Sequence, residues 1–153
     1  MNTVRRLLLV LLALSGLSLT IGCQEDASPA DTSLMTGVEK AYLEFALNHL
    51  QTVGEDIATL GTLFNSPAVE DEYWKASVTV LLNRIELAQE SIAFLEPTER
   101  LQPFQTAAEG TLVHAAAFAK ALRDMLTAGT TTLSDEAAQE LVKTSEGFDE
   151  VER

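Results

Sequence analysis

Apolar residues recur in steps of three and four through most of the chain after residue 37, and this spacing predicts a series of amphipathic helices. The first predicted helix begins at a possible capping box, Thr36 to Glu39, in which the Thr36 side chain accepts from the Glu39 amide. It ends near Asn65, after which Ser66 is expected to cap the next helix and Pro67 to take its first position. The apolar side of the first helix is expected to comprise Val38, Tyr42, Phe45, His49, Val53, Ile57, Leu60 and Phe64.

Two further long stretches show the same spacing and end at residues that disfavour helix. The second has Trp74 and Ile85 on its apolar side and ends near Pro97, because proline disfavours helix in the residue before it. The third starts near Gln102-Pro103, is rich in alanine, and stops at Gly129. Its many small side chains are expected to let a neighbouring helix approach closely.

A shorter helix is expected at the C-terminal end, capped by Ser134 and fraying around Gly147. No segment alternates apolar and polar residues with a period of two, so strands are not expected. Three long helices and one shorter helix, joined by short connectors, favour antiparallel neighbours. The sequence therefore predicts an all-α fold, an up-down-up-down four-helix bundle with Trp74 packed near one end.

The chain begins with a segment that is typical of exported proteins. Arg5 and Arg6 precede an apolar run over residues 7–19, as in a secretory leader, whose apolar region has roughly 7–15 residues. This run is shorter than the roughly 20 residues that span a bilayer. Cys23, the single cysteine, follows Thr20-Ile21-Gly22, and the chain turns polar directly after it. These residues resemble the lipobox of bacterial lipoproteins, which implies that the Cys23 thiol is acylated and that cleavage occurs before it.

The resemblance divides the chain into three parts. Residues 1–22 are expected to be the lipoprotein signal peptide, residues 23–33 the lipidated cysteine with a flexible tether, and residues 34–153 the helical bundle domain. The implied location is a cell membrane or outer membrane, where the lipid-anchored protein faces the periplasm or the exterior. Because there is no second cysteine, an internal disulfide is impossible and the domain must depend on its core.

The charge of the chain limits its partners. Removal of residues 1–22 leaves 131 residues with 8 Lys and Arg against 23 Asp and Glu, a formal net charge of −15. Such a surface repels nucleic acids and anionic lipid headgroups. The acidic residues concentrate in the tether and the predicted C-terminal helix, so a basic protein is the expected partner besides the membrane. A solvated acidic surface without a partner is the simpler interpretation.

A search for catalytic or cofactor motifs finds none in the sequence. The chain lacks a glycine-rich phosphate loop, a Cys-x-x-Cys-His haem attachment and a His-Glu-x-x-His zinc helix. Di-iron bundles need Glu-x-x-His, but the nearest acids, Glu44 before His49 and Glu109 before His114, stand five residues away on other helix faces. The sequence therefore predicts no catalytic residue, no enzyme activity and no cofactor.

The two histidines remain as candidates for ligand binding. His49 is expected in the middle of the apolar side of the first helix, and His114 at the edge of that of the third. Since these helices would run parallel in the bundle, the two side chains would lie at similar depth, with space for a metal, a haem or a polar ligand between them. The simpler interpretation is that each histidine bonds to a neighbour such as Gln89 or reaches solvent. Cys23 is thus the predicted lipidation site, and His49 and His114 are the metal candidates.

A second resemblance lies in the mature chain. Residues 97–101, Pro-Thr-Glu-Arg-Leu, followed by His114 and the alanine-rich helix, are similar to a pattern in uncharacterised helical lipoproteins of bacteria, and the similarity covers about a quarter of the mature chain. It implies no activity. The sequence favours a membrane-anchored cell-envelope lipoprotein that acts as a non-catalytic interaction or structural module. The alternative is small-ligand, metal or haem binding in the bundle core through His49 and His114.

Overall fold

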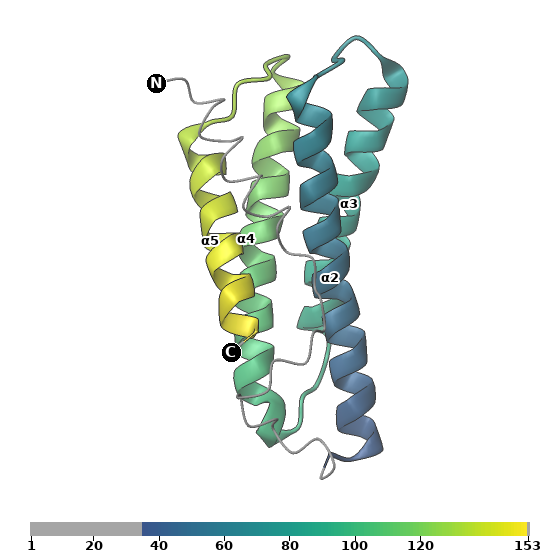
Figure 1. Cartoon of the computed structure of the whole chain (residues 1–153), viewed down its shortest axis with the longest axis vertical. Helices are drawn as coiled ribbons and strands as arrows, with labels where there is room; N and C mark the ends of the chain where they lie inside the picture. Colours follow the sequence, from purple (N-terminus) through teal and green to yellow (C-terminus); the bar gives the residue numbers. More distant parts are fainter. Residues whose placement is uncertain (1–34, 153) are drawn as a thin grey trace, which may run out of the picture.

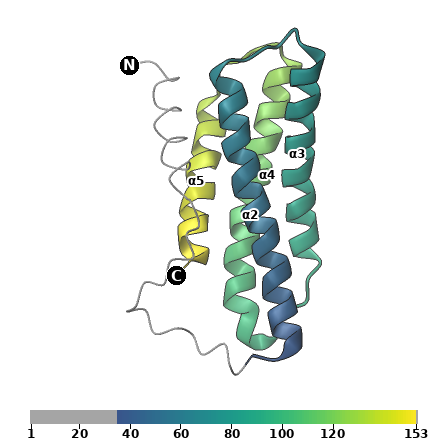
Figure 2. The same ribbon diagram turned by 45° about the vertical axis from the view of Figure 1, so that its right-hand side comes forward.

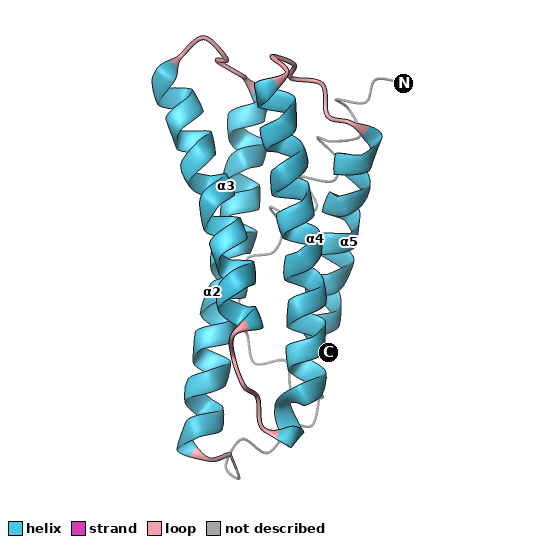
Figure 3. Cartoon of the chain, turned by 180° about the vertical axis from the view of Figure 1, so that it is seen from behind, coloured by secondary structure: helices cyan, strands magenta, loops and turns pink. Residues whose placement is uncertain are grey.

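The structure, a computed structural model, describes residues 35–152, and every regular element in this range is a helix (Figure 1). The elements are α2 (Gly37–Asn65), α3 (Glu72–Ala93), the short 3-10 helix η2 (Glu99–Leu101), α4 (Gln102–Thr127) and α5 (Asp135–Val151). The prediction of an all-α fold with three longer helices and a shorter C-terminal one is confirmed over this range. The helices form a bundle: the loops from α2 to α3 and from α4 to α5 lie at one end, and the α3–α4 connection lies at the other (Figure 3).

Helix α4 is the central element of the bundle. It packs against α3 on one side and against α5 on the other, while α2 packs mainly against α3 (Figure 2). Ala108 and Ala115 of this alanine-rich helix have no exposed surface, as the predicted close approach of a neighbouring helix requires. The Phe148 side chain of α5 extends toward α2, and its Cζ lies 4.0 Å from the position that a Cβ on Gly54 would take.

The closest contact between α4 and α5 is at Gly147. A Cβ added there would lie 2.5 Å from Thr111 Oγ1 and 3.1 Å from Thr111 Cα, so only glycine fits. The prediction that α5 frays around Gly147 is wrong, because the helix continues to Val151. A glycine inside a helix usually indicates weakness, but here it allows two backbones to pack closely.

Two of the predicted helix caps are confirmed. Glu39 N donates to Thr36 Oγ1 over 3.2 Å and Thr36 N donates to Glu39 Oε2 over 2.8 Å, which completes the capping box of α2. At the start of α5, Ala137 N donates to Ser134 Oγ over 3.1 Å. In both cases a side chain satisfies a backbone amide that has no partner inside the helix.

The predicted start of the second helix is wrong. Ser66 and Pro67 belong to the connection, and the cap of α3 is Asp71, whose Oδ1 accepts from Tyr73 N over 2.7 Å. Just before the helix, Asp71 N donates to Ala68 O over 2.8 Å and closes a turn. Serine and aspartate cap about equally well, so local preference alone could not choose between these two positions.

Trp74 joins the end of α2 to the start of α3. Its indole Nε1 donates to Leu63 O over 3.2 Å, and its ring meets that of Phe64 edge-on with centroids 5.2 Å apart. The side chain is only 7% exposed. The prediction that Trp74 packs near one end of the bundle is therefore confirmed.

The core follows the predicted apolar sides with one clear exception on α2. The sequence predicts Val38 and Phe45 in the core, but they are 74% and 45% exposed. Ala46, with no exposed surface, faces the neighbouring helices instead, because a small side chain lets α2 approach them closely. The largest fully buried apolar side chains are Val53, Ile57, Leu60, Val78, Leu82, Ile85, Ile92, Leu112 and Leu141.

Candidate functional site

The predicted lipidation site, Cys23, lies outside the described residues, as do the predicted signal peptide and tether. Among residues 35–152, none of the helices combines the length and the apolar character needed to cross a membrane. Within the described residues, five features of the bundle could carry chemistry: the two histidines, a buried amide, a buried carboxylate, a cavity and the acidic α5 helix.

His114 takes part in an ionic link between α4 and α5. Its Nδ1 lies 2.6 Å from Glu140 Oε2, and Lys143 Nζ donates to the other oxygen, Glu140 Oε1, over 2.7 Å. The hydrogen bonds from Lys143 and then from His114 lower the pKa of the Glu140 carboxyl below its usual value. A lowered pKa stabilises the fold above the ordinary glutamate pKa, and this contribution is lost as the pH falls through the pKa of the folded state. Glu140 thus helps to hold α5 against α4.

His49 has a different environment from His114. Its ring stacks edge-on against Phe45 on its own helix, with centroids 4.4 Å apart. In the part of the chain that the structure describes, no group of three or more His, Cys, Asp or Glu side chains is placed to hold a metal ion. His49 and His114 therefore have separate partners on different helices, and no observed contact links them in a shared ligand site.

Gln105 is a buried amide that the sequence analysis did not single out. The hydroxyl of Tyr42, on α2, donates to its Oε1, while its Nε2 donates to Ile92 O over 2.9 Å and to Glu109 Oε1. Burial, and secondarily the Glu109 charge, raises the pKa of Tyr42. The Gln105 amide therefore bonds to residues on α2, α3 and α4, and both its oxygen and its nitrogen have partners. Because a buried amide of this kind is fully satisfied by the protein, Gln105 has a structural role. A glutamine within an otherwise apolar helix side was the only available signal.

Asp56 is the least satisfied polar group among the described residues. It is 3% exposed, and Oδ2 accepts no hydrogen bond, although Arg84 Nε lies 3.2 Å away. The Arg84 guanidinium and the Asp56 carboxylate thus attract each other as opposite charges, but their geometry is not that of a hydrogen bond. Burial raises the pKa of Asp56, and the Arg84 charge only partly opposes this effect.

The raised pKa of Asp56 predicts a pH-dependent cost to stability. The folded state retains the proton to a higher pH than the unfolded chain does, so the wild type loses stability as the pH rises from about 3.8 through the pKa of the folded state. In an Asp56→Asn variant this loss is absent. We therefore expect the variant to gain stability relative to the wild type as the pH rises through this window, in urea unfolding measured from pH 3 to pH 7. A difference that is constant with pH, or that changes in the opposite direction, would contradict the raised pKa.

A cavity of about 400 Å³ lies between α3 and α4, at the end where α4 turns into the loop to α5. Trp74, Leu82 and Leu126 form apolar parts of its wall, and neither His49 nor His114 lines it. Its basic residues are already engaged, because Lys75 Nζ bonds to Glu72 and Arg123 bonds to Glu86, each over 2.8 Å. The cavity therefore offers no unpaired cation for an acidic ligand.

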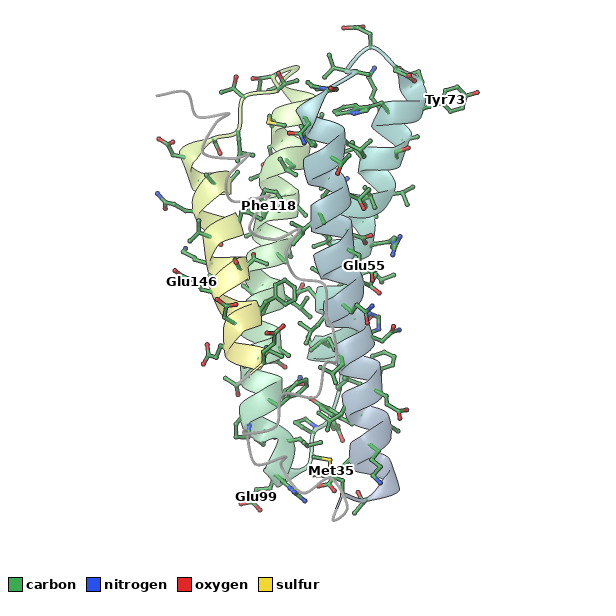
Figure 4. The ribbon with its side chains drawn as sticks, viewed as in Figure 1. Met35, Glu55, Tyr73, Glu99, Phe118 and Glu146 are labelled. Carbon is green, nitrogen blue, oxygen red and sulfur yellow. The ribbon has the colours of Figure 1, made fainter. Side chains whose placement is uncertain are left out.

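Helix α5 carries the most concentrated charge in the described part. It holds six acidic residues and one basic residue, Lys143, which is bonded to Glu140. Glu146, Glu150 and Glu152 are exposed at its C-terminal end and are called here the α5 carboxylate cluster. Figure 4 shows Glu146 pointing outward from the bundle. Within Asp135–Val151 no basic residue occupies the last turn of the helix, where a cation would offset the negative end of the helix dipole.

The comparisons with known proteins add no relative: no protein-family model matches the chain, and no curated protein or solved structure is significantly similar to it. The function is therefore argued from the sequence and from the features described above.

Proposed function

We propose that this chain is a cell-envelope lipoprotein, exported and held at a cell membrane or outer membrane by acyl chains on Cys23. The support is the basic start, the short apolar run and the Gly22-Cys23 junction, together with a single thiol that has no disulfide partner. One acyl chain binds a membrane only marginally, so the several chains that the lipobox implies are needed for a stable anchor. Residues 23–33 then act as the tether to the helical domain.

The acylation of Cys23 can be tested directly. We expect the N-terminal peptide of protein extracted from membranes to begin at Cys23 and to carry acyl chains such as palmitate, as measured by mass spectrometry. A Cys23→Ala variant should keep the signal peptide and lose this modification. An unmodified Cys23 in protein extracted from membranes would exclude the lipid anchor.

We further infer that the described helices form an up-down-up-down four-helix bundle. The placement of successive loops at alternate ends supports this arrangement (Figure 3). The packing of α4 against α3 and α5, and of α2 against α3, also supports it, because each helix then lies beside its neighbour in the chain. Such a bundle presents long, rigid outer faces, which suits a module that works by contact.

We propose that the anchored domain is a non-catalytic interaction module whose partner is a basic protein surface. The observation that carries this proposal is the α5 carboxylate cluster, in which exposed glutamates stand near the negative end of a helix whose last turn, within Asp135–Val151, holds no basic residue. A Lys or Arg side chain of a partner would pair with a carboxylate and offset the dipole at the same time. Binding there should therefore stabilise α5 as well as join two proteins.

The interaction is tested by removing charge without changing shape. A variant with glutamine at Glu146, Glu150 and Glu152 should bind a lysine-rich helical peptide, and native basic partners, roughly tenfold more weakly. Binding by the wild type should also weaken as salt rises, since exposed charges are screened over about 8 Å at physiological ionic strength. Titration calorimetry at low and physiological salt measures both effects.

A matched control variant loses the same number of negative charges at positions away from α5. Glu44, Glu90 and Glu96 are exposed on or beside α2 and α3, and their joint replacement by glutamine should leave binding nearly unchanged. If binding is indifferent to salt and to the α5 substitutions, or falls equally in the control, the carboxylate cluster is not the binding surface.

A further inference from the structure

Helix α3 carries a row of large apolar side chains on its outer side. Tyr73, Val80 and Leu87 of α3 and Phe94, which caps its C-terminal end, are 87%, 55%, 60% and 86% exposed, and each is seven residues after the last. Seven residues turn an α-helix by about 700°, about 20° short of two full turns, so the four side chains stay on one side of the helix and shift around it by about 60° in total. This line, called here the α3 ridge, spans about 32 Å. Figure 4 shows Tyr73, at one end of it, pointing away from the bundle.

The ridge is separate from the side of α3 that packs in the core. A helix on the surface of a bundle normally has a polar outer side, but α3 is apolar on both sides. An exposed line of apolar side chains along a helix is a surface against which another protein segment can pack. The core side of α3 comprises Trp74, Val78, Leu81, Leu82, Ile85, Ala88 and Ile92.

The ridge lies on a nearly uncharged side of an acidic protein. The chain has a formal net charge of −13, yet on the side of α3 that carries the ridge the one charged residue is Arg84, whose Nε lies 3.2 Å from Asp56 Oδ2. Glu72 and Glu90 stand only at the border of this face. Ala76, Asn83 and Ser91, which lie on the same side of α3 as the ridge, are uncharged.

These properties fit a second copy of the chain better than other occupants. Two copies that met through α5 would repel each other, while two that met through the ridge would bring little like charge together. The ridge also matches itself. In parallel pairing each residue faces its own counterpart, and in antiparallel pairing Tyr73 faces Phe94 while Val80 faces Leu87. Aromatic side chains meet aromatic ones and aliphatic meet aliphatic in either case, and the contacts are reciprocal, as in a two-fold interface.

We propose that the α3 ridge is a self-association surface, on which α3 of a second copy packs. The interface joins two domains through their α3 helices and leaves both α5 helices open. It depends neither on acylation of Cys23 nor on the α5 carboxylate cluster, so its test is independent of the proposed function.

Photo-crosslinking in cells that express the full chain tests the self-association. A benzophenone amino acid in place of Ala76, which is exposed beside the ridge, should give an adduct with twice the mass of the chain. Leu87→Glu should reduce this adduct by roughly tenfold or more, because it places a charged side chain from each copy in the apolar contact. Val80→Glu should do the same. Leu47→Glu, at a position on α2 with a similar exposed fraction of 48%, should leave the adduct unchanged.

The attachment point of the crosslink and the folding of the variants complete the test. The crosslink should reach a peptide around residue 76 in a parallel pair or around residue 91 in an antiparallel pair. An adduct that joins α3 to α2, α4 or α5 of the second copy would overturn the proposal, as would an adduct with a different protein or no adduct at all. Circular dichroism should show unchanged helix content in the glutamate variants, since these positions are exposed. An adduct that persists in well-folded Leu87→Glu and Val80→Glu would also overturn it.

Discussion

Replacing Ile85 by alanine is expected to lower the free energy of unfolding by about 2–5 kcal/mol. The Ile85 side chain has no exposed surface and lies in the middle of the core side of α3. Its truncation removes buried apolar area and leaves a cavity that close-packed neighbours can only partly fill. Urea unfolding followed by circular dichroism measures the change, and the helix content of the folded variant should match that of the wild type.

Phe45→Ala is the informative comparison for Ile85→Ala. The sequence places both residues on apolar helix sides, but Phe45 is 45% exposed and stacks only on His49 at the edge of the core. We expect a loss of about 1–2 kcal/mol, clearly smaller than for Ile85 in spite of the larger side chain. Equal losses for the two variants would mean that Phe45 is packed in the core.

Replacing Gly147 by alanine is expected to destabilise the protein by about 1–3 kcal/mol, although alanine normally stabilises a helix relative to glycine. The added Cβ would lie 2.5 Å from Thr111 Oγ1, 3.0 Å from Thr111 Cβ and 3.1 Å from Thr111 Cα. A rotation of the Thr111 side chain cannot relieve the contact with its backbone, so α5 must move away from α4. Urea unfolding gives the loss, and faster amide hydrogen exchange in α5 would locate it.

Gly110→Ala provides the matched control for Gly147→Ala. Gly110 is also inside a helix but is exposed, and an added Cβ would meet nothing within 4 Å. The same substitution should therefore stabilise the protein by about 0.5–1 kcal/mol through helix propensity alone. If both variants gain stability, the α4–α5 contact has more freedom than the structure indicates.

The helices were predictable because their signals are local. Steps of three and four residues, the capping box at Thr36 and the terminal signals at Gly129 and Ser134 each depend on a few neighbouring residues. Gly129 indeed has a positive φ of 68°, the conformation that ends a helix at glycine. Errors occurred where two local signals compete, as between Ser66 and Asp71 for the cap of α3.

The contacts between helices were much less predictable. Which of Phe45 and Ala46 faces the core depends on how closely α2 approaches its neighbours, and the sequence does not state that distance. The need for glycine at position 147 likewise depends on the nearby Thr111, which is 36 positions earlier in the chain. His114 was noticed as a histidine, but its partner Glu140 becomes visible only when α4 and α5 lie side by side. The predicted lipidation of Cys23 rests on a short motif that folding does not alter.

The hydrogen bonds of Gln105 have a consequence for the alignment of the bundle along its axis. Apolar helix faces can slide past each other by one turn, about 5.4 Å, and still bury similar side chains. A slide of this size would separate the Gln105 amide from Tyr42 on α2 and from the Ile92 carbonyl on α3, and would leave buried polar atoms without partners. One amide side chain thus fixes the axial register of three helices, a property that their apolar contacts alone do not determine.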